Sequence, residues 1–259
     1  MRIHPVAAFQ DNYIWIIDTA AKGSDHEPCV IVDPGDAEPV LAYLEQERLR
    51  PEAILLTHHH WDHTGGVNSI LEHFPCPVYG PYSDKIPQVS HRLTEGDRIS
   101  LLAGALNLEV IACPGHTLDH IAFYGDERLF CGDTLFAGGC GRMFEGHPAQ
   151  FWESLQKLAV LPEKTKVYCA HEYTAANLRF AARVEPNNEA IQARLAQVEQ
   201  LRADGQVTLP SVLADEHATN PFLRAEKSSV RNAAETKEKH PLATPTEVFA
   251  AIRRWKDSA

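Results

Sequence analysis

The chain contains the stretch THHHWDHTGG at residues 57–66, directly after a short apolar run that predicts a strand. Neutral imidazole nitrogens and carboxylate oxygens are preferred ligands of zinc-like and iron-like cations. If the strand continues through the motif, His58 and His60 share one face, because side chains alternate along a strand. Asp62 and His63 lie in the turn that follows and can point elsewhere. We therefore predict that this one segment supplies ligands to two metal ions.

Three further polar residues follow apolar segments later in the chain. They are His116 in Pro-Gly-His-Thr, Asp133 in Cys-Gly-Asp-Thr and His171 in Ala-His-Glu. A single histidine or aspartate at a strand end is usually a cap or turn residue, but proteins with mixed strands and helices also assemble their sites there. Together with the first motif, these residues predict a closed two-metal site. A surface histidine cluster is the competing interpretation, but the motif is internal and follows a strand.

Other residues near the ligands are expected to support them. His59 alternates to the face opposite His58 and His60, so we predict that it packs or orients a ligand. Asp119 and Glu172 are expected to orient imidazoles through hydrogen bonds.

Composition restricts the class of protein. The chain has 259 residues, 44% of them hydrophobic and 23% charged, as in ordinary globular proteins, and a formal net charge of −11. That charge, with no long basic run, excludes a general nucleic-acid binder. The N-terminus lacks a signal-peptide core and no run approaches 18 apolar residues, so no membrane partner is expected. Six cysteines without a C-x-x-C pair favour a reducing compartment, and we expect a cytoplasmic monomer.

The chain changes character near residue 172. Before it, short strands outnumber helices and do not alternate strictly with them, which predicts a sandwich of two sheets with flanking helices. After it, helical patterns dominate, including a last helix that begins at Thr244-Pro245 with a capping box. We predict two domains, residues 1–171 and 172–259.

These motifs resemble a known family. The ligand pattern is similar to that of the metallo-β-lactamase superfamily. Further segments resemble glyoxalase II, also called hydroxyacylglutathione hydrolase, over essentially the whole chain: GDTLF at 132–136, GCGR at 139–142, YCAHEYT at 168–174 and NPFLR at 220–224. The resemblance implies the fold class α+β, with an αββα metallo-β-lactamase-like sandwich followed by a C-terminal helical domain.

The resemblance also implies the ligand set. One divalent ion would be held by His58, His60 and His116, and the second by Asp62, His63 and His171, with Asp133 bridging both. Zinc is the expected metal, with iron and manganese as alternatives, because histidine and carboxylate ligands suit all three.

A substrate patch follows from the same resemblance. Arg142 and the last-helix residues Arg253 and Lys256 match basic residues that contact the glycine carboxylate of glutathione, and Tyr173 matches an aromatic hydroxyl near the tripeptide. Some members have a lysine at position 142 and a tyrosine at position 144, where this chain has Arg142 and Phe144. Arginine retains the charge and can bind a carboxylate through two hydrogen bonds. The hydroxyl at position 144 is lost.

The implied activity is hydrolysis of S-(2-hydroxyacyl)glutathione, above all S-D-lactoylglutathione, to glutathione and D-lactate, the second step of methylglyoxal detoxification. Metal binding lowers the pKa of water from about 15.7 towards roughly 7, which supplies the nucleophile. The catalytic residues act through that water and are His58, His60, Asp62, His63 and Asp133. The leaving thiolate, with a pKa near 8.5 by the cysteine reference, needs no general acid.

Three alternatives use the same scaffold. A glutathione-persulfide dioxygenase would engage one iron. The long helical tail and the full ligand set favour the two-metal hydrolase over it. A lactonase or β-lactamase would have no use for the basic last helix. A non-catalytic glutathione-binding module is the third alternative.

Overall fold

The computed structural model describes residues 1–19 and 26–259. The described chain forms two compact units. The N-terminal unit contains Met1–Ala112 and Asp119–Gly132, and the C-terminal unit contains Cys113–Leu118 and Asp133–Ala259. This division groups residues 133–171 with the helical tail, whereas the predicted domain boundary lies after residue 171. That boundary stays a prediction.

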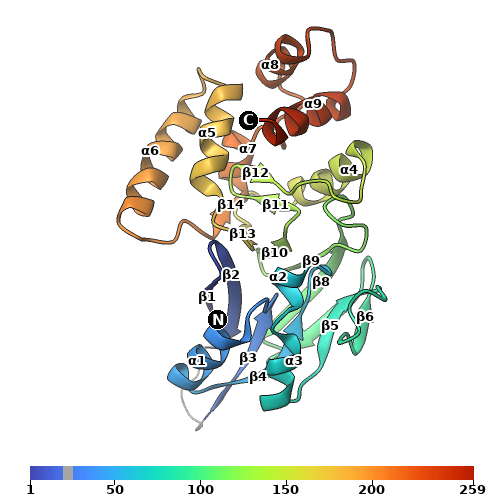
Figure 1. Ribbon diagram of the computed structural model, residues 1–259, viewed down its shortest axis with the longest axis vertical. Coiled ribbons are helices and arrows are strands. Elements are labelled where there is room, and N and C mark those ends of the chain that lie inside the picture. The colour runs from blue at the N-terminus through green and yellow to red at the C-terminus, as the bar shows by residue number, and fades with distance from the viewer. Residues whose placement is uncertain (20–25) are drawn as a thin grey trace. The chain divides into compact units, whose positions relative to one another are not determined.

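The first sheet of the N-terminal unit has six strands in sequence order (Figure 1). The first three pair antiparallel, and the third to the sixth pair parallel. The second strand is buried along its whole length, which explains why its sequence is apolar on both faces. The strands are β1 (Arg2–Ala8), β2 (Asn12–Asp18), β3 (Glu27–Val32), β4 (Leu49–Leu55), β5 (Val78–Pro81) and β6 (His91–Leu93).

Helices α1 (Ala37–Glu47) and α3 (Val67–His73) bury their apolar side chains in a cluster with this sheet. Asp36 caps α1, because its side chain accepts a hydrogen bond from the Glu38 amide at 3.1 Å. The helix ends where Arg48 adopts a left-handed backbone conformation. Leu49 follows directly and begins β4, because the reversal at Arg48 ends the helix.

The second sheet of this unit contains four antiparallel strands in the order β10-β9-β8-β7. Asp126 and Glu127 join β9 to β10 and both have positive φ, the conformation that a tight two-residue hairpin requires. Its strands are β7 (Arg98–Leu101), β8 (Leu106–Ala112), β9 (Ile121–Gly125) and β10 (Arg128–Gly132).

The C-terminal unit is mostly helical after His171, as predicted. A short hairpin joins β11 (Leu135–Phe136) to β12 (Gly139–Cys140), and β13 (Lys166–Cys169) pairs antiparallel with β14 (Ser211–Val212). The helices are α4 (Pro148–Ala159), α5 (Thr174–Val184), α6 (Glu189–Ala203), α7 (Leu213–Thr219), α8 (Ser228–Glu238) and α9 (Pro245–Asp257).

The last helix begins as predicted. The Thr244 side chain accepts from the Glu247 amide at 3.2 Å, and the Glu247 carboxylate accepts from the Ala243 amide at 2.6 Å. This reciprocal pair fixes the entry of α9, whose apolar residues Val248, Phe249 and Ile252 are buried. All six cysteines lie among the described residues as free thiols. No helix in the described part of the chain is long and apolar enough to cross a membrane.

Candidate metal centre and substrate patch

The histidine motif lies in a loop rather than in a strand. Strand β4 ends at Leu55, so the strand alternation expected for His58 and His60 does not apply. The loop still brings imidazoles together: the ring centroid of His58 lies 4.7 Å from that of His60 and 4.1 Å from that of His63. The short helix α2 (Trp61–Thr64) carries His63 and Asp62, with the His63 Nε2 3.5 Å from an Asp62 carboxylate oxygen.

Asp33 organises this loop, and its role was not predicted from the sequence. Its buried carboxylate accepts from the Thr57 amide at 2.8 Å, from the Thr57 hydroxyl at 2.7 Å and from His63 Nδ1 at 3.0 Å. Asp33 directly follows β3, and β3 pairs in parallel with β4, so the two strand ends are neighbours. The sequence did contain a signal for this role. Asp33 follows an apolar strand, β3, which is the neighbour of the strand that precedes the histidine motif.

For two imidazoles, those of His58 and His63, these contacts assign the tautomer of the neutral ring. A carboxylate only accepts, so His63 donates from Nδ1 and its Nε2 carries the lone pair. The Thr57 hydroxyl gives its proton to Asp33 and therefore accepts from His58 Nδ1, 3.0 Å away. The His58 lone pair is then also on Nε2. Asp33 thus orients two predicted metal ligands through one carboxylate.

Two neighbouring contacts complete the loop. Asn12 donates to the Asp62 carboxylate at 3.1 Å and so orients it. Residue 35 must be glycine, because a Cβ there would lie 1.8 Å from the Asp62 carbonyl oxygen. His59 contacts Asp119 through Nδ1 at 2.8 Å, which agrees with the orienting role expected for that aspartate.

The C-terminal unit brings together His116, Asp133 and His171. One Asp133 oxygen lies 3.4 Å from His116 Nε2, and the other oxygen lies 3.4 Å from His171 Nε2. Each carboxylate oxygen therefore faces a different imidazole. This is the arrangement that a carboxylate needs if it is to bridge two cations, each with its own histidine.

Backbone and aromatic groups orient these two imidazoles. His116 Nδ1 lies 2.7 Å from the Arg142 carbonyl oxygen, which only accepts, so the His116 lone pair is on Nε2. The His171 ring stacks on Tyr173 with centroids 4.8 Å apart and meets the Phe136 ring edge-on at 5.7 Å. A donor set of imidazole nitrogens and carboxylate oxygens fits a divalent cation.

Arg142 and Phe144 form the exposed part of the predicted substrate patch. The Arg142 side chain is 61% exposed, and its guanidinium carbon lies 5.8 Å from the centre of the Phe144 ring. Phe144 is 60% exposed and its ring lies 5.3 Å from that of His116. An exposed cation beside an exposed ring, next to the predicted ligand His116, suits an anionic substrate with an apolar part.

The two basic residues of α9 are placed differently. Arg253 is 4% exposed and donates to the Cys140 carbonyl at 2.9 Å and to Asp257 at 3.0 Å. Its predicted contact with substrate stays a prediction. Lys256 donates to the Asn177 side chain. Burial, together with the nearby Arg253 charge, lowers the pKa of Lys256 to about 8.

Each unit therefore assembles a part of the predicted site. The N-terminal unit gathers four predicted ligands, which are His58, His60, Asp62 and His63. The C-terminal unit gathers three predicted ligands and the residues of the predicted patch, which are His116, Asp133, His171, Arg142, Phe144, Tyr173, Arg253 and Lys256.

Comparison with known proteins identifies the family. Residues 11–171 match the metallo-beta-lactamase superfamily, and residues 172–259 match the hydroxyacylglutathione hydrolase C-terminus. The chain belongs to the hydroxyacylglutathione hydrolase family. A relative of that name from Idiomarina loihiensis is 51% identical over 259 residues and covers 100% of both chains. Another, from Alkalilimnicola ehrlichii, is 54% identical over 254 residues, 98% of each chain.

Solved structures share the fold of this hydroxyacylglutathione hydrolase family member. ETHE1 from Myxococcus xanthus has a TM-score of 0.66 at 24% identity and covers 100% of this chain and 99% of its own. The BLEG-1 B3 metallo-beta-lactamase has a TM-score of 0.61 at 25% identity, over 86% and 98%. TTHA1623 in a di-iron-bound form has a TM-score of 0.54 at 30% identity, over 66% and 92%. The predicted family and the predicted metallo-β-lactamase-like fold with a helical C-terminal domain are confirmed.

Proposed function

We propose that the chain hydrolyses S-(2-hydroxyacyl)glutathione thioesters, with S-D-lactoylglutathione as the main substrate, and releases glutathione and D-lactate. Relatives that are named hydroxyacylglutathione hydrolase support this activity, because they are 50–54% identical to the chain along nearly its whole length. The structural observation that carries the proposal is the Asp133 carboxylate, which faces His116 with one oxygen and His171 with the other. The reaction belongs to methylglyoxal detoxification.

The family and its fold support a dependence on divalent metal. We further propose that His58, His60 and His116 hold one ion, that Asp62, His63 and His171 hold a second, and that Asp133 bridges them. Zinc is the proposed metal, with iron and manganese as alternatives. When bound, divalent ions supply Lewis acidity, which lowers the pKa of water towards roughly 7 and polarises a carbonyl.

The chain's own residues prepare this chemistry before substrate arrives. Asp33 and the Arg142 carbonyl keep the protons of His63 and His116 on Nδ1, so the Nε2 lone pairs stay available. Donors that are already oriented need no reorganisation during the reaction. The thiolate of glutathione leaves without a proton donor, because its pKa, near 8.5 by the cysteine reference, lets it depart as an anion.

Substrate binding is assigned to the C-terminal unit. Arg142 and Lys256 would pair with the glutathione glycine carboxylate, and Tyr173 and Phe144 would contact the tripeptide. Arg253 would contact the same carboxylate, as the resemblance implies, and its guanidinium also donates to the Cys140 carbonyl and to Asp257. A monomeric state and a cytoplasmic location stay predictions.

Thioester absorbance tests the activity directly. Purified chain loaded with zinc should remove S-D-lactoylglutathione and release one free thiol for each thioester lost. Metal-loaded protein that leaves the thioester intact would overturn the proposal. Two parallel assays measure the alternatives: oxygen uptake with glutathione persulfide for a dioxygenase, and ring opening of a neutral lactone for a lactonase.

A further inference from the structure

The hairpin of β11 and β12 connects two parts of the proposed site. It begins directly after Asp133-Thr134 and ends directly before Gly141-Arg142, and the Gly141 amide donates to the Thr134 carbonyl at 3.3 Å. The proposed bridging ligand and the proposed carboxylate-binding arginine are therefore at the two feet of one hairpin. A shift of the hairpin would move both.

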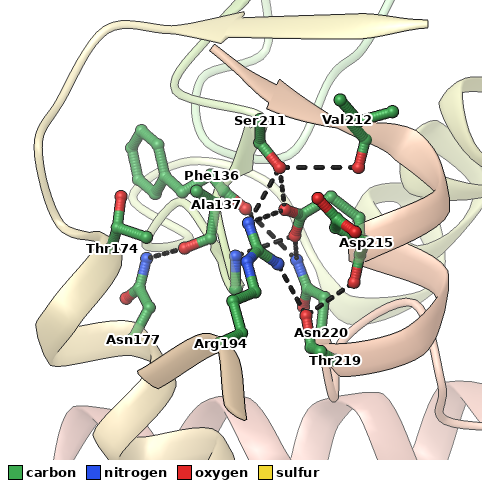
Figure 2. A network of polar contacts seen from close by, with 12 residues as sticks. Phe136, Ala137, Thr174, Asn177, Arg194, Ser211, Val212, Asp215, Thr219 and Asn220 are labelled. Atoms are coloured by element: carbon green, nitrogen blue, oxygen red, sulfur yellow. Dashed lines mark hydrogen bonds and ion pairs between the residues drawn. The ribbon is translucent and has the colours of Figure 1, made fainter. Parts of the chain in front are cut away.

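Side chains hold the tip of this hairpin through its backbone. Asn177 on α5 donates to the Ala137 carbonyl at 3.0 Å, and Asn220 donates to the Phe136 carbonyl at 3.2 Å and to the Gly139 carbonyl at 2.8 Å. Figure 2 shows both amide side chains directed at the hairpin. A glutamate carboxylate, that of Glu216 on α7, accepts from the Gly138 amide at 2.7 Å.

Glu216 is the centre of this network and is fully buried. One of its oxygens accepts from the Gly138 amide and from Asn220 at 2.9 Å. The other accepts from the Ser211 hydroxyl and from Arg194 at 2.7 Å. The Gly138, Asn220 and Arg194 groups only donate, so both Glu216 oxygens act as acceptors towards them. A buried carboxylate is expensive to desolvate unless it is paired, and Arg194 supplies that pairing.

Arg194 is itself held in place from two further directions. Its guanidinium donates to the Thr219 hydroxyl at 2.6 Å and to the Ser211 hydroxyl at 2.8 Å (Figure 2). The Thr219 hydroxyl in turn donates to the Asp215 carbonyl at 2.6 Å. The ion pair thus ties α6 to α7 and presents one fixed oxygen to the hairpin backbone.

We propose that Glu216, held by Arg194, is a positioning residue for the reaction: it sets the 135–140 hairpin and thereby the placement of Asp133 and Arg142. This inference rests on the proposed function of those two residues. An ion pair with a purely structural role would stabilise the helices but would not affect kcat or KM. The Gly138 amide contact distinguishes the two roles, because it leads from the ion pair to the hairpin.

The variant Glu216→Gln tests the contact. The glutamine side chain can take two orientations, and in both its NH2 group faces another donor and loses a hydrogen bond. In one orientation that donor is Arg194, and in the other the donors are the Gly138 amide and Asn220. The double variant Arg194→Met with Glu216→Gln removes the first conflict. The glutamine carbonyl then remains on Gly138 and Asn220, and its NH2 faces the Ser211 hydroxyl, which accepts.

A second buried ion pair in the same unit provides a matched control. Arg224 donates to Glu185 at 2.7 and 2.9 Å, and Ser229 donates to it at 2.6 Å. Like Glu216, Glu185 is buried and accepts from an arginine and a serine, and neither of these lies in the hairpin. Glu216 differs because it also accepts from the hairpin amide of Gly138. The variant Glu185→Gln therefore perturbs the helices without the link to Asp133 and Arg142.

Steady-state kinetics, zinc content after dialysis and Tm are measured for each variant. Glu216→Gln should lower kcat/KM roughly 10- to 100-fold, since small displacements of reacting groups have effects of about that size. The loss should appear in both kcat and KM, with a lower zinc content. The double variant should recover most of the activity, and Glu185→Gln should lower Tm while its kinetics match wild type at a temperature where it is folded.

Equal kinetic losses in Glu216→Gln and Glu185→Gln, or wild-type kinetics in Glu216→Gln, would overturn the proposal. If Glu216→Gln does not fold, the variant Glu216→Asp tests the positioning role. Its shorter side chain keeps the charge opposite Arg194 but does not also reach the Gly138 amide. Wild-type kinetics in Glu216→Asp would then refute the positioning role. A wild-type chain that does not hydrolyse S-D-lactoylglutathione refutes the proposed function instead, and zinc retention, which needs no turnover, then tests the positioning of Asp133 separately.

Discussion

Each unit orients an imidazole through an acceptor at Nδ1, but the two units use different acceptors. In the N-terminal unit a side chain does so, since the Asp33 carboxylate accepts from His63 directly and orients His58 through Thr57. In the C-terminal unit the acceptor for His116 is a backbone carbonyl, that of Arg142. A carboxylate can be removed by one substitution, whereas a carbonyl is lost only if the chain moves. The orientation of His58 and His63 therefore depends on one side chain, and that of His116 depends on the placement of the backbone at Arg142.

The largest expected effect comes from Asp133→Asn, which removes an anionic oxygen from between His116 and His171. Metal polarisation supplies several kcal/mol of transition-state stabilisation, so its disruption should lower kcat by roughly 1,000-fold or more. Lactoylglutathione kinetics and zinc analysis measure this. Asp126→Asn, in an exposed hairpin turn, is the control and should leave both unchanged. Full turnover in Asp133→Asn would refute the bridging role.

Asp33→Asn tests the dependence of the N-terminal unit on one carboxylate. The amide would direct an NH2 group at either the Thr57 amide or His63 Nδ1, and the latter moves the His63 proton to Nε2. Loss of such an orienting partner usually weakens metal binding by about 10- to 100-fold. Competition with a zinc chelator measures the affinity. Asp36→Asn is matched, because asparagine caps α1 equally well, and it should retain wild-type affinity. Equal affinities in the two variants would argue against the Asp33 role.

The depressed pKa of Lys256 predicts an opposite effect of pH on binding and on stability. Above about pH 8 the ammonium loses its proton, so KM for the anionic substrate should rise. Loss of one charge-assisted hydrogen bond, about 1.5 kcal/mol, corresponds to roughly tenfold. Between pH 8 and the ordinary value of 10.5, the folded chain binds fewer protons than the unfolded chain, so the contribution of Lys256 to the free energy of unfolding rises. Initial rates and urea melts across pH 7–10 measure both.

Lys256→Gln is the control for that pH dependence. It should have a raised KM already at pH 7 and should not show the further rise above pH 8. A rise in KM that persists unchanged in Lys256→Gln would assign the titration to a different group.

The smallest expected effect is a gain from Phe144→Tyr in the exposed part of the patch. A hydroxyl at this position would add one hydrogen bond to the tripeptide, about 0.5–1 kcal/mol, so KM should fall about two- to fivefold with kcat unchanged. Phe9→Tyr adds a hydroxyl to an exposed ring of the N-terminal unit and should not alter KM. An unchanged KM in Phe144→Tyr would place the tripeptide away from this ring.

Helix and strand positions were predictable where local chemistry decides them. The capping box at Thr244 was found in the sequence because its signals lie within a few neighbouring residues. His58 and His60 were placed on a strand that ends three residues earlier, although their proximity was correct.

The sequence by itself determined the chemistry of the centre and the family, because imidazole and carboxylate ligands and their local spacing are properties of the residues present. Only the tertiary structure decided how those residues are held. Asp33 lies 30 positions from His63, Glu216 lies 78 positions from Gly138, and Arg253 lies 113 positions from Cys140. Hydrogen bonds and burial over such separations depend on where the chain returns in space, and no local pattern of residue types records that.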